Sequence, residues 1–274
     1  MQKLVAALAL VRLAAITAVA LPLQMLAVRF GWRLARTLPV WWHRRAIAAA
    51  GVRVHVTGAP VPERPLLVTP NHCSWLDITV IASLMPISFV AKSEVASWPL
   101  FGLFAKLQRT VFVDRTRRTA TGRAASELAD RLSAGDCMVL FPEGTSSTGN
   151  AVLPFRSALL GAARAAIDGG GHERVWVQPM TVAYTRIAGM PIGRAERPRV
   201  GWYGDMELAD HLWGVFCAGG IDVDIVWGEP LPFDATTDRK KLAATLEAAV
   251  RGGLNARLRP PPRVEGSEAA ETAA

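Results

Sequence analysis

Acidic residues are missing from the start of the chain, where no Asp or Glu precedes Glu63. The same segment holds eight Lys and Arg residues, which equal the whole net charge of +8 because the other 23 Lys and Arg are matched by 23 Asp and Glu. A basic segment that is also rich in Leu, Ala and Trp indicates contact with an anionic membrane surface. Nucleic-acid binding would more often spread its charge over a folded face, so the pattern argues against a nucleic-acid partner.

Cysteine is also scarce: Cys73, Cys137 and Cys217 are far apart and lack CxxC spacing. This pattern predicts neither a disulfide framework nor a zinc site, and it fits a reducing compartment. We interpret Cys73 as a small apolar packing residue rather than a nucleophile. A GxSxG elbow is absent as well, because GTSSTG at 144–149 lacks that spacing, which argues against a serine hydrolase.

A long uninterrupted apolar run is absent too. The uncharged stretch 13–28 is short and contains Pro22, and the apolar stretch 31–50 carries four Arg and three Trp, a residue that favours membrane interfaces. We therefore expect residues 1–50 to form membrane-anchoring helices that lie in one leaflet. A tilted single span and a signal peptide cleaved near Ala20 are the alternatives, the second disfavoured because the pattern continues past that site.

Beyond residue 50, apolar strand-like runs alternate with helical patterns, and the length allows one sizeable core. This alternation predicts an α/β domain over 51–259, a mixed central sheet flanked by helices, with the site in loops at strand ends. The polar tail 260–274 is expected to be disordered. Expected strands are 52–57, 66–69, 87–91, 110–113, 137–141, 175–184 and 221–227; expected helices are 78–84, 98–107, 121–132, 152–167 and 239–257.

One stretch, 68–81, places His72 and Asp77 five residues apart where a loop enters an apolar run. Ser74 followed by Asp77 has the form of a capping box, so His72 should precede a helix and Asp77 should lie in its first turn. An imidazole oriented by a carboxylate can take a proton from a hydroxyl. The pair therefore predicts a general base, and a capping or surface histidine is the competing interpretation.

A second candidate region follows the expected strand 137–141, where Pro142, Glu143 and Gly144 precede three hydroxyl residues. The N–H groups of such a loop can face an anion or an acyl oxygen, and an ordinary turn is the alternative. The apolar stretch 98–107 is expected either to pack in the core or to form a wall for an acyl chain or a membrane contact.

Four ordered blocks together resemble the glycerolipid acyltransferase family, which includes lysophosphatidic acid acyltransferases: NHCSWLD at 71–77, VFVDR at 111–115, FPEGTSS at 141–147 and VQPMTV at 177–182. The resemblance covers roughly residues 52–227. It implies an O-acyltransferase of lipid biosynthesis at the cytoplasmic face of a bacterial inner membrane. The acyl group would pass from a thioester of acyl carrier protein or coenzyme A to the hydroxyl of a lysolipid.

The resemblance also implies roles for single residues. His72 is the general base, Asp77 orients it, and Pro179 shapes the fourth block. The implied substrate-binding residues are Asn71, Lys92, Arg115, Glu143, Gly144, Thr145, Ser146 and Arg156. No metal, cofactor or covalent enzyme intermediate is implied, because the acceptor hydroxyl attacks the thioester directly.

Two departures from the family pattern bear on the acceptor. Relatives that acylate lysophosphatidic acid commonly have Arg where Ser146 stands, and Arg109 stands where the second block usually begins with Gly. An arginine fork is the usual partner of a phosphate monoester, so its absence weakens the phosphate interpretation. The stretches 146–159 and 202–208 are more similar to bacterial lyso-ornithine lipid O-acyltransferases.

The favoured acceptor is therefore lyso-ornithine lipid, whose ammonium would meet Glu143 and whose carboxylate would meet Arg115 or Lys92. A 1-acyl-sn-glycerol-3-phosphate acyltransferase that makes phosphatidic acid is the first alternative. A non-catalytic lipid-binding membrane protein is the second, and the intact His72 and Asp77 argue against it.

Overall fold

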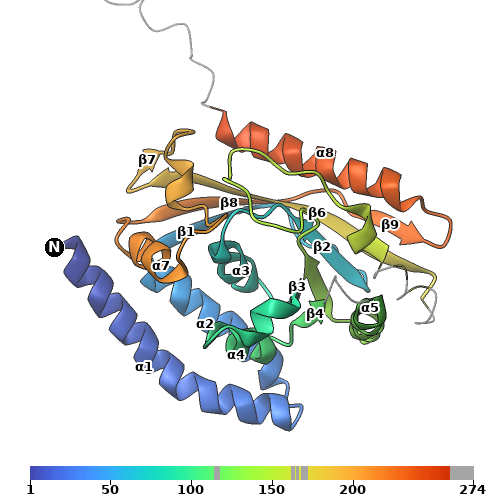
Figure 1. The fold of residues 1–274 in the computed structure, drawn as a ribbon, viewed down its shortest axis with the longest axis horizontal. Coiled ribbons are helices and arrows are strands. Elements are labelled where there is room, and N and C mark those ends of the chain that lie inside the picture. The colour runs from blue at the N-terminus through green and yellow to red at the C-terminus, as the bar shows by residue number, and fades with distance from the viewer. Residues whose placement is uncertain (114–117, 162–163, 165–166, 168–171, 260–274) are drawn as a thin grey trace, which may run out of the picture.

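The computed structural model describes residues 1–113, 118–161, 164, 167 and 172–259. They form one central sheet with the strand order β1-β8-β6-β2-β5-β3-β4, to which β7 and β9 add by pairing with β6 (Figure 1). The strands are β1 Val52–Thr57, β2 Leu66–Pro70, β3 Ser88–Lys92, β4 Val111–Val113, β5 Cys137–Leu140, β6 Arg174–Ile187, β7 Met190–Pro191, β8 Ile221–Trp227 and β9 Leu231–Asp234.

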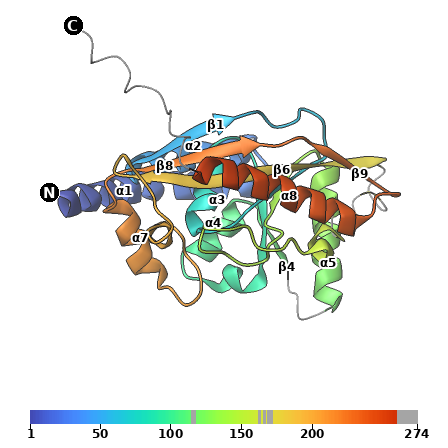
Figure 2. The ribbon, with the colours of Figure 1, turned by 90° about the horizontal axis from the view of Figure 1, so that it is seen from above.

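The helices lie on both faces of this sheet. They are α1 Gln2–Arg29, α2 Leu34–Ala49, α3 Trp75–Ala82, α4 Phe101–Leu107, α5 Arg118–Ser133, α7 Leu208–Phe216 and α8 Arg239–Leu258, with 3-10 turns η1 Ser93–Ser97, η2 Ser157–Leu160 and η3 Arg197–Arg199. One hydrophobic cluster joins α2, α3 and α7 to the sheet, and a second joins α5 and α8 to its other face. Figure 2 shows α8 lying along β6.

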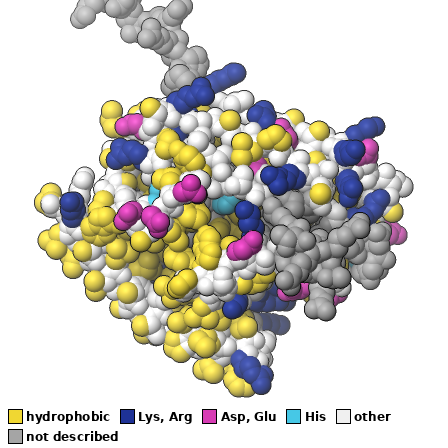
Figure 3. Space-filling view, in the orientation of Figure 1, with side chains coloured by type: hydrophobic (Ala, Val, Ile, Leu, Met, Phe, Trp, Pro, Cys, Tyr) yellow, Lys and Arg dark blue, Asp and Glu magenta, His cyan; other side chains and the backbone are white. Residues whose placement is uncertain are grey.

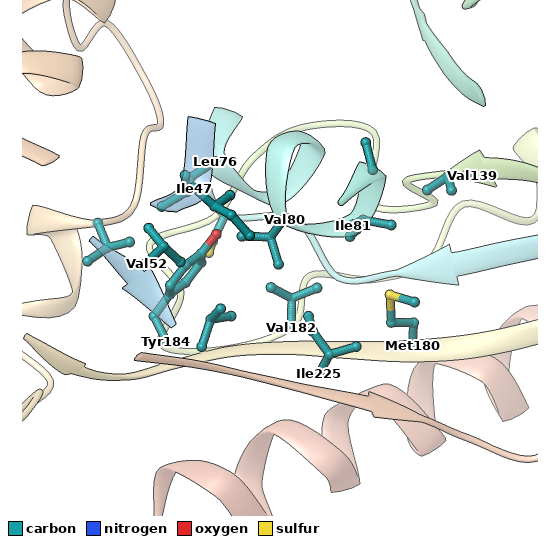
Figure 4. Close-up of a cluster of buried hydrophobic side chains, with 14 of the residues drawn as sticks. Ile47, Val52, Leu76, Val80, Ile81, Val139, Met180, Val182, Tyr184 and Ile225 are labelled. Carbon is teal, nitrogen blue, oxygen red and sulfur yellow. The ribbon is translucent and has the colours of Figure 1, made fainter. Parts of the chain in front are cut away.

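The central strands of the sheet are apolar, and helices cover both of their faces. Every residue of β2 is buried, as expected for a strand in a parallel sheet between two helical layers. Leu76 and Val80 of α3 pack from one side on Val182 and Ile225 of the two neighbouring strands β6 and β8, and Figure 4 shows α8 beyond those strands. The α/β fold with a mixed sheet is therefore confirmed.

Pairing directions divide the sheet into two parts. The strands β6, β2, β5, β3 and β4 are successively parallel, whereas β8 is antiparallel to β6 and parallel to β1. The carboxyl ends of five neighbouring strands consequently meet at one edge of the sheet.

One expected helix is wrong in its first part. Residues 152–156 have no helical structure, because Leu153 N donates to the Glu143 carboxylate (2.9 Å) and Arg156 N donates to the carbonyl of Pro142 (2.9 Å). Helical turns begin at Ser157, so Arg156 precedes the helix instead of lying in its first turn. The tail expected to be disordered, 260–274, lies outside the described residues.

The N-terminal part consists of two helices, as expected, but α1 continues through Pro22 and has 28 residues. By length and composition it is a candidate membrane span, the one such helix in the described part of the chain. Its outer side is apolar, with Leu4, Val11 and Val19 each more than 60% exposed. Hydrophobic side chains gather over α1, α4 and α7 on the face shown in Figure 3.

The helix α1 is nevertheless attached side-on to the rest of the protein. The buried Gln24 donates from Nε2 to the carbonyls of Ala35 in α2 (3.0 Å) and Leu107 in α4 (2.9 Å). The indole of Trp42 in α2 donates to the Thr17 hydroxyl of α1 (2.9 Å). Polar contacts of this kind fix α1 against α2 and α4.

Two adjacent glycines of α8 provide a stability test. A methyl group at Gly253 would lie 2.2 Å from Thr181 Oγ1 and 3.2 Å from its Cβ, whereas nothing lies within 4 Å of one at Gly252. Gly253→Ala should lower the free energy of unfolding by about 1–3 kcal/mol because α8 must move away from β6. Gly252→Ala should raise it by up to about 1 kcal/mol, the usual helix-propensity gain. Urea unfolding of both variants measures the difference, and equal effects would contradict the close packing of α8 on β6.

Candidate active site

The parallel strands bring most of the predicted site residues to one edge of the sheet. His72 follows β2, Glu143 follows the adjacent β5, and Lys92 ends β3 on the far side of β5. Lys92 is exposed and stands in register with Val113, the last residue of β4. Arg115 follows β4 but lies outside the described residues.

The capping box at the start of α3 is confirmed, and it also builds the proposed catalytic pair. Ser74 has extended backbone angles and its hydroxyl accepts from Leu76 N, while Asp77 Oδ2 accepts from Ser74 N (2.9 Å). The same Oδ2 lies 2.8 Å from His72 Nδ1. Asp77, the N3 residue of the capping box, is therefore also the residue that holds the imidazole.

This geometry fixes the chemistry of the ring. An ionised carboxylate only accepts hydrogen bonds, so Nδ1 of His72 carries the ring proton and Nε2 is the basic nitrogen. The ring stacks on Phe141 with centroids 4.0 Å apart, and its side chain keeps 18% exposure. His72 is thus held on one edge and one face and is accessible to a substrate hydroxyl.

Asp77 is completely buried and receives more donors than the sequence indicates. Besides the contacts above, Oδ2 accepts from Cys73 N (2.7 Å), and Oδ1 accepts from the Tyr184 hydroxyl (2.8 Å). Burial, and then the nearby Asp77 charge, raise the pKa of Tyr184 well above its usual value, so the phenol remains a donor. Sequence reasoning missed Tyr184, because a Tyr near the end of a buried strand has no distinguishing local pattern.

Cys73 is a packing residue, as the sequence analysis expected. It is fully buried, and burial together with the charge of Asp77 raises the pKa of its thiol well above the usual range. A thiol that remains protonated is a poor nucleophile. Cys73 instead donates its backbone N–H to Asp77 and accepts at its carbonyl from Trp202 N (2.7 Å).

Asn71 positions the loop. Its amide Nδ2 donates to the carbonyl of Val182 (2.9 Å) and its Oδ1 accepts from Val182 N (2.8 Å). This pair of bonds continues the pairing between β2 and β6 beyond the last strand residue, with a side chain in place of the backbone. Both polar ends of the buried Asn71 side chain are used in this way, so Asn71 holds the loop that carries His72 and is not placed to contact a substrate.

Glu143 also faces inward, which corrects the expectation that it receives the acceptor's ammonium. The side chain is 1% exposed, and its two oxygens accept from His72 N (2.7 Å) and Leu153 N (2.9 Å). Burial raises the pKa of Glu143 to about 7, and these two backbone hydrogen bonds lower it only in part. Glu143 therefore ties the third block to the histidine loop.

Glu143 makes folding depend on pH in a direction that can be measured. The carboxyl ionises near pH 4.5 when unfolded and near 7 when folded, so between these values the folded state retains a proton that the unfolded state has lost. Stability should therefore fall as pH rises through this window, by about 3 kcal/mol from this group. Urea unfolding across the window should show the fall in the wild type and in the exposed control Glu63→Gln.

Glu143→Gln should flatten that pH profile, because an amide does not titrate. The substitution should also lower the free energy of unfolding at low pH by about 1–3 kcal/mol, because the NH2 group of Gln would face one of the two backbone N–H donors. An unchanged slope in Glu143→Gln would show that another group titrates in this window.

The rest of the third block lies next to His72. Gly144 has a φ of +73°, which glycine adopts without strain, and the chain then turns so that Ser147 N donates to the carbonyl of His72 (2.9 Å). Thr145 is exposed and Ser146 is half-buried. The backbone N–H groups of 145–146 therefore lie in a segment attached to the histidine loop at both ends.

Residues just before the stretch 202–208 lie against the other stretch that resembled lyso-ornithine lipid acyltransferases, 146–159. A methyl group at Gly201 would lie 3.3 Å from the carbonyl oxygen of Thr148 and 3.5 Å from that of Cys73. Arg197 Nη1 donates to Asn150 Oδ1 (2.8 Å) across the same contact. Segments far apart in sequence thus pack together next to the loop that carries His72. In the described ranges, no group of three His, Cys, Asp or Glu side chains is placed to hold a metal.

Comparison with known proteins identifies the family. The Acyltransferase family model matches residues 53–183. A lyso-ornithine lipid O-acyltransferase from Brucella abortus is 50% identical, over 87% of this chain and 89% of that protein. A 1-acyl-sn-glycerol-3-phosphate acyltransferase from Neisseria gonorrhoeae is 31% identical, over 75% and 76%.

The fold is also that of a solved structure. The crystal structure of the 1-acyl-sn-glycerophosphate acyltransferase PlsC from Thermotoga maritima superposes with a TM-score of 0.64 at 23% identity, over 95% of this chain and 100% of that one. The family model and the 50% identity to a relative of matching length show that this chain belongs to the Acyltransferase family and is an acyltransferase.

Proposed function

We propose that this chain is a lyso-ornithine lipid O-acyltransferase that uses an acyl thioester of acyl carrier protein or coenzyme A as co-substrate. The observation that carries the proposal is the 2.8 Å contact between His72 Nδ1 and Asp77 Oδ2, in a chain half identical to a lyso-ornithine lipid O-acyltransferase. The thioester is a substrate, and the chemistry requires no bound cofactor.

The reaction is a direct acyl transfer. His72 Nε2 takes the proton from the acceptor hydroxyl as the oxygen attacks the thioester carbonyl carbon. The N–H groups of residues 145–146 donate to the oxyanion that forms. Collapse of this tetrahedral intermediate breaks the C–S bond, and the proton on His72 passes to the leaving thiolate. Asp77 stabilises the imidazolium throughout.

Cations at the edge of the sheet recognise the head group in this proposal. Lys92 forms no ion pair with any described residue, and it lies on the strand next to the one that precedes Arg115. A carboxylate on the acceptor would form an ion pair with one or both of these cations. Arg156, which is exposed beside the third block, is a further candidate.

A panel of acceptors tests the assignment. Full-length protein supplied with labelled acyl carrier protein should convert lyso-ornithine lipid with a higher kcat/KM than lysophosphatidic acid. Ser146→Arg should move the ratio toward lysophosphatidic acid by about tenfold, because an arginine fork binds a phosphate monoester well. Thr245→Arg, on the exposed side of α8, is the charge-matched control. A wild type that prefers lysophosphatidic acid would refute the head-group assignment and leave the acyltransferase assignment standing.

We further propose that α1 and α2 attach the protein to the cytoplasmic leaflet of the inner membrane without crossing it. The support is the side-on contact of α1 with α2 and α4 through Gln24, which keeps α1 beside the domain. Tags at both termini should then be protected from protease outside intact cells. Accessibility of the N-terminal tag alone would indicate a membrane-spanning α1.

A further inference from the structure

Three arginines surround one carboxylate at the edge of the sheet opposite His72. Asp136, which precedes β5, lies 2.5 Å from Arg131 Nε, 3.0 Å from Arg109 Nη2 and 3.3 Å from Arg36 Nη2. Among the described residues no second carboxylate pairs with any of the three. The cluster Arg36–Arg109–Arg131–Asp136 therefore has two more positive than negative charges, and we call it the arginine cluster.

The excess charge is partly removed from water. The Asp136 side chain is 8% exposed, and the Arg131, Arg109 and Arg36 side chains are 14%, 28% and 52% exposed. Burial and the charge of Arg131 lower the pKa of Arg109 below the usual range for arginine, which reflects this repulsion. Placing like charges in such surroundings is unfavourable unless an anion compensates them.

Arg109 also has a strained backbone. Its φ is +61°, in the left-handed region, which costs a residue with a side chain about 1 kcal/mol and costs glycine nothing. In this conformation the side chain donates to Asp136, and the Arg109 carbonyl accepts from Arg131 Nη1 (2.6 Å). A glycine would fit this backbone better, so the contacts that Arg109 makes in the cluster offset a backbone cost.

Exposed aromatic side chains lie close to Arg36 in the chain. Arg36 lies in the first turn of α2, directly after the turn that joins α1 to α2. That turn carries Phe30 and Trp32, which are 61% and 47% exposed and stack at 5.7 Å. Exposed aromatic rings beside arginines are typical of the head-group layer of a membrane. The partly exposed guanidinium of Arg36 thus joins the cluster to this layer.

We propose that the arginine cluster binds the phosphate of an anionic membrane lipid, at a site separate from the catalytic loop. Guanidinium groups recognise phosphate oxygens through two parallel N–H donors, and one phosphate would compensate the charge that Asp136 leaves unbalanced. The inference does not depend on the acceptor or on the proposed reaction, because it concerns binding at the opposite edge of the sheet.

Charge-conserving variants of the full-length protein test the site. Arg109→Lys and Arg36→Lys keep the net charge but lose the planar fork, so each should weaken binding to phosphatidylcholine vesicles that contain phosphatidylglycerol by about tenfold. Arg45→Lys, also on α2 but outside the cluster, should bind these vesicles as the wild type does. On vesicles of pure phosphatidylcholine, all three variants should bind as the wild type does. Vesicle flotation measures the affinities, and circular dichroism tests whether each variant folds. If Arg109→Lys does not fold, Arg36→Lys alone tests the site, because Arg36 is the most exposed member of the cluster.

Three results would overturn the proposal. Equal binding by the Arg36, Arg109 and Arg45 variants would show that diffuse charge alone attracts the membrane. Binding of inorganic phosphate that depends on Arg109, with unchanged vesicle affinity in Arg109→Lys, would make free phosphate the ligand. If Arg36→Lys and Arg109→Lys keep their vesicle binding but have a raised KM for acyl carrier protein, the cluster binds an acidic protein instead of a lipid.

Discussion

Replacing His72 by alanine is expected to lower the rate of acyl transfer by about 10² to 10⁴, with the fold intact. An aliphatic hydroxyl ionises far above neutral pH, so transfer is slow unless a base takes its proton as the oxygen attacks. The His72 ring contacts the Asp77 carboxylate and the face of Phe141, and it remains partly exposed. Removing its ring therefore takes away the base together with the stacking on Phe141.

The measurement is the initial rate with saturating acyl donor and lysolipid acceptor. His172→Ala is the control, because His172 precedes β6 at the opposite edge of the sheet. If His72→Ala keeps more than about a tenth of the wild-type rate, His72 is not the general base. The alternative of a lipid-binding protein without catalysis would then become the better interpretation.

Asp77→Asn should reduce both transfer and stability. The Asp77 carboxylate accepts hydrogen bonds from the His72 ring, two backbone N–H groups and the Tyr184 hydroxyl. An amide has only one oxygen and cannot accept from all of these donors. We expect a loss of about 10² or more in transfer, because the ring is no longer held in its tautomer. We expect a loss of about 2–5 kcal/mol in stability, because buried donors are left without acceptors.

Two further variants separate these effects. Tyr184→Phe removes one donor to Asp77 and should cost about 1 kcal/mol of stability with much less effect on transfer. The double variant His72→Ala, Asp77→Asn should transfer little more slowly than His72→Ala alone, because the two groups act as a unit. Urea unfolding together with initial rates distinguishes the outcomes. Asp77→Asn with wild-type stability would contradict the hydrogen-bonding role of the carboxylate.

Local patterns predicted most of the strands and the centre of the site. The capping box and the five-residue spacing of His72 and Asp77 were readable because both are contacts within a few residues. The seven expected strands are present, because apolar runs in a buried parallel sheet stand out from polar loops.

Contacts between segments that are distant in the chain could not be predicted from the sequence. The Tyr184 hydroxyl meets Asp77 only because β6 lies beside β2, and the inward orientation of Glu143 depends on the backbone of His72 and Leu153. The same carboxylate accepts from Leu153 N and holds the segment 152–156, which also contains Pro154, outside the expected helix. Tertiary hydrogen bonds outweighed local preference in each case.

The position of β2 in the sheet has a consequence for the order in which the protein can mature. Both neighbours of β2 are made later by the ribosome: β5 begins at Cys137 and β6 at Arg174. The bonds from Asn71 to Val182 span 111 residues, and the bond from Tyr184 to Asp77 spans 107. The apolar hairpin of α1 and α2 therefore emerges, and is available to lipid, well before the acyl-transfer centre can close. A nascent chain of this enzyme should reach the bilayer inactive and gain its activity there, after more than half of its length has been translated.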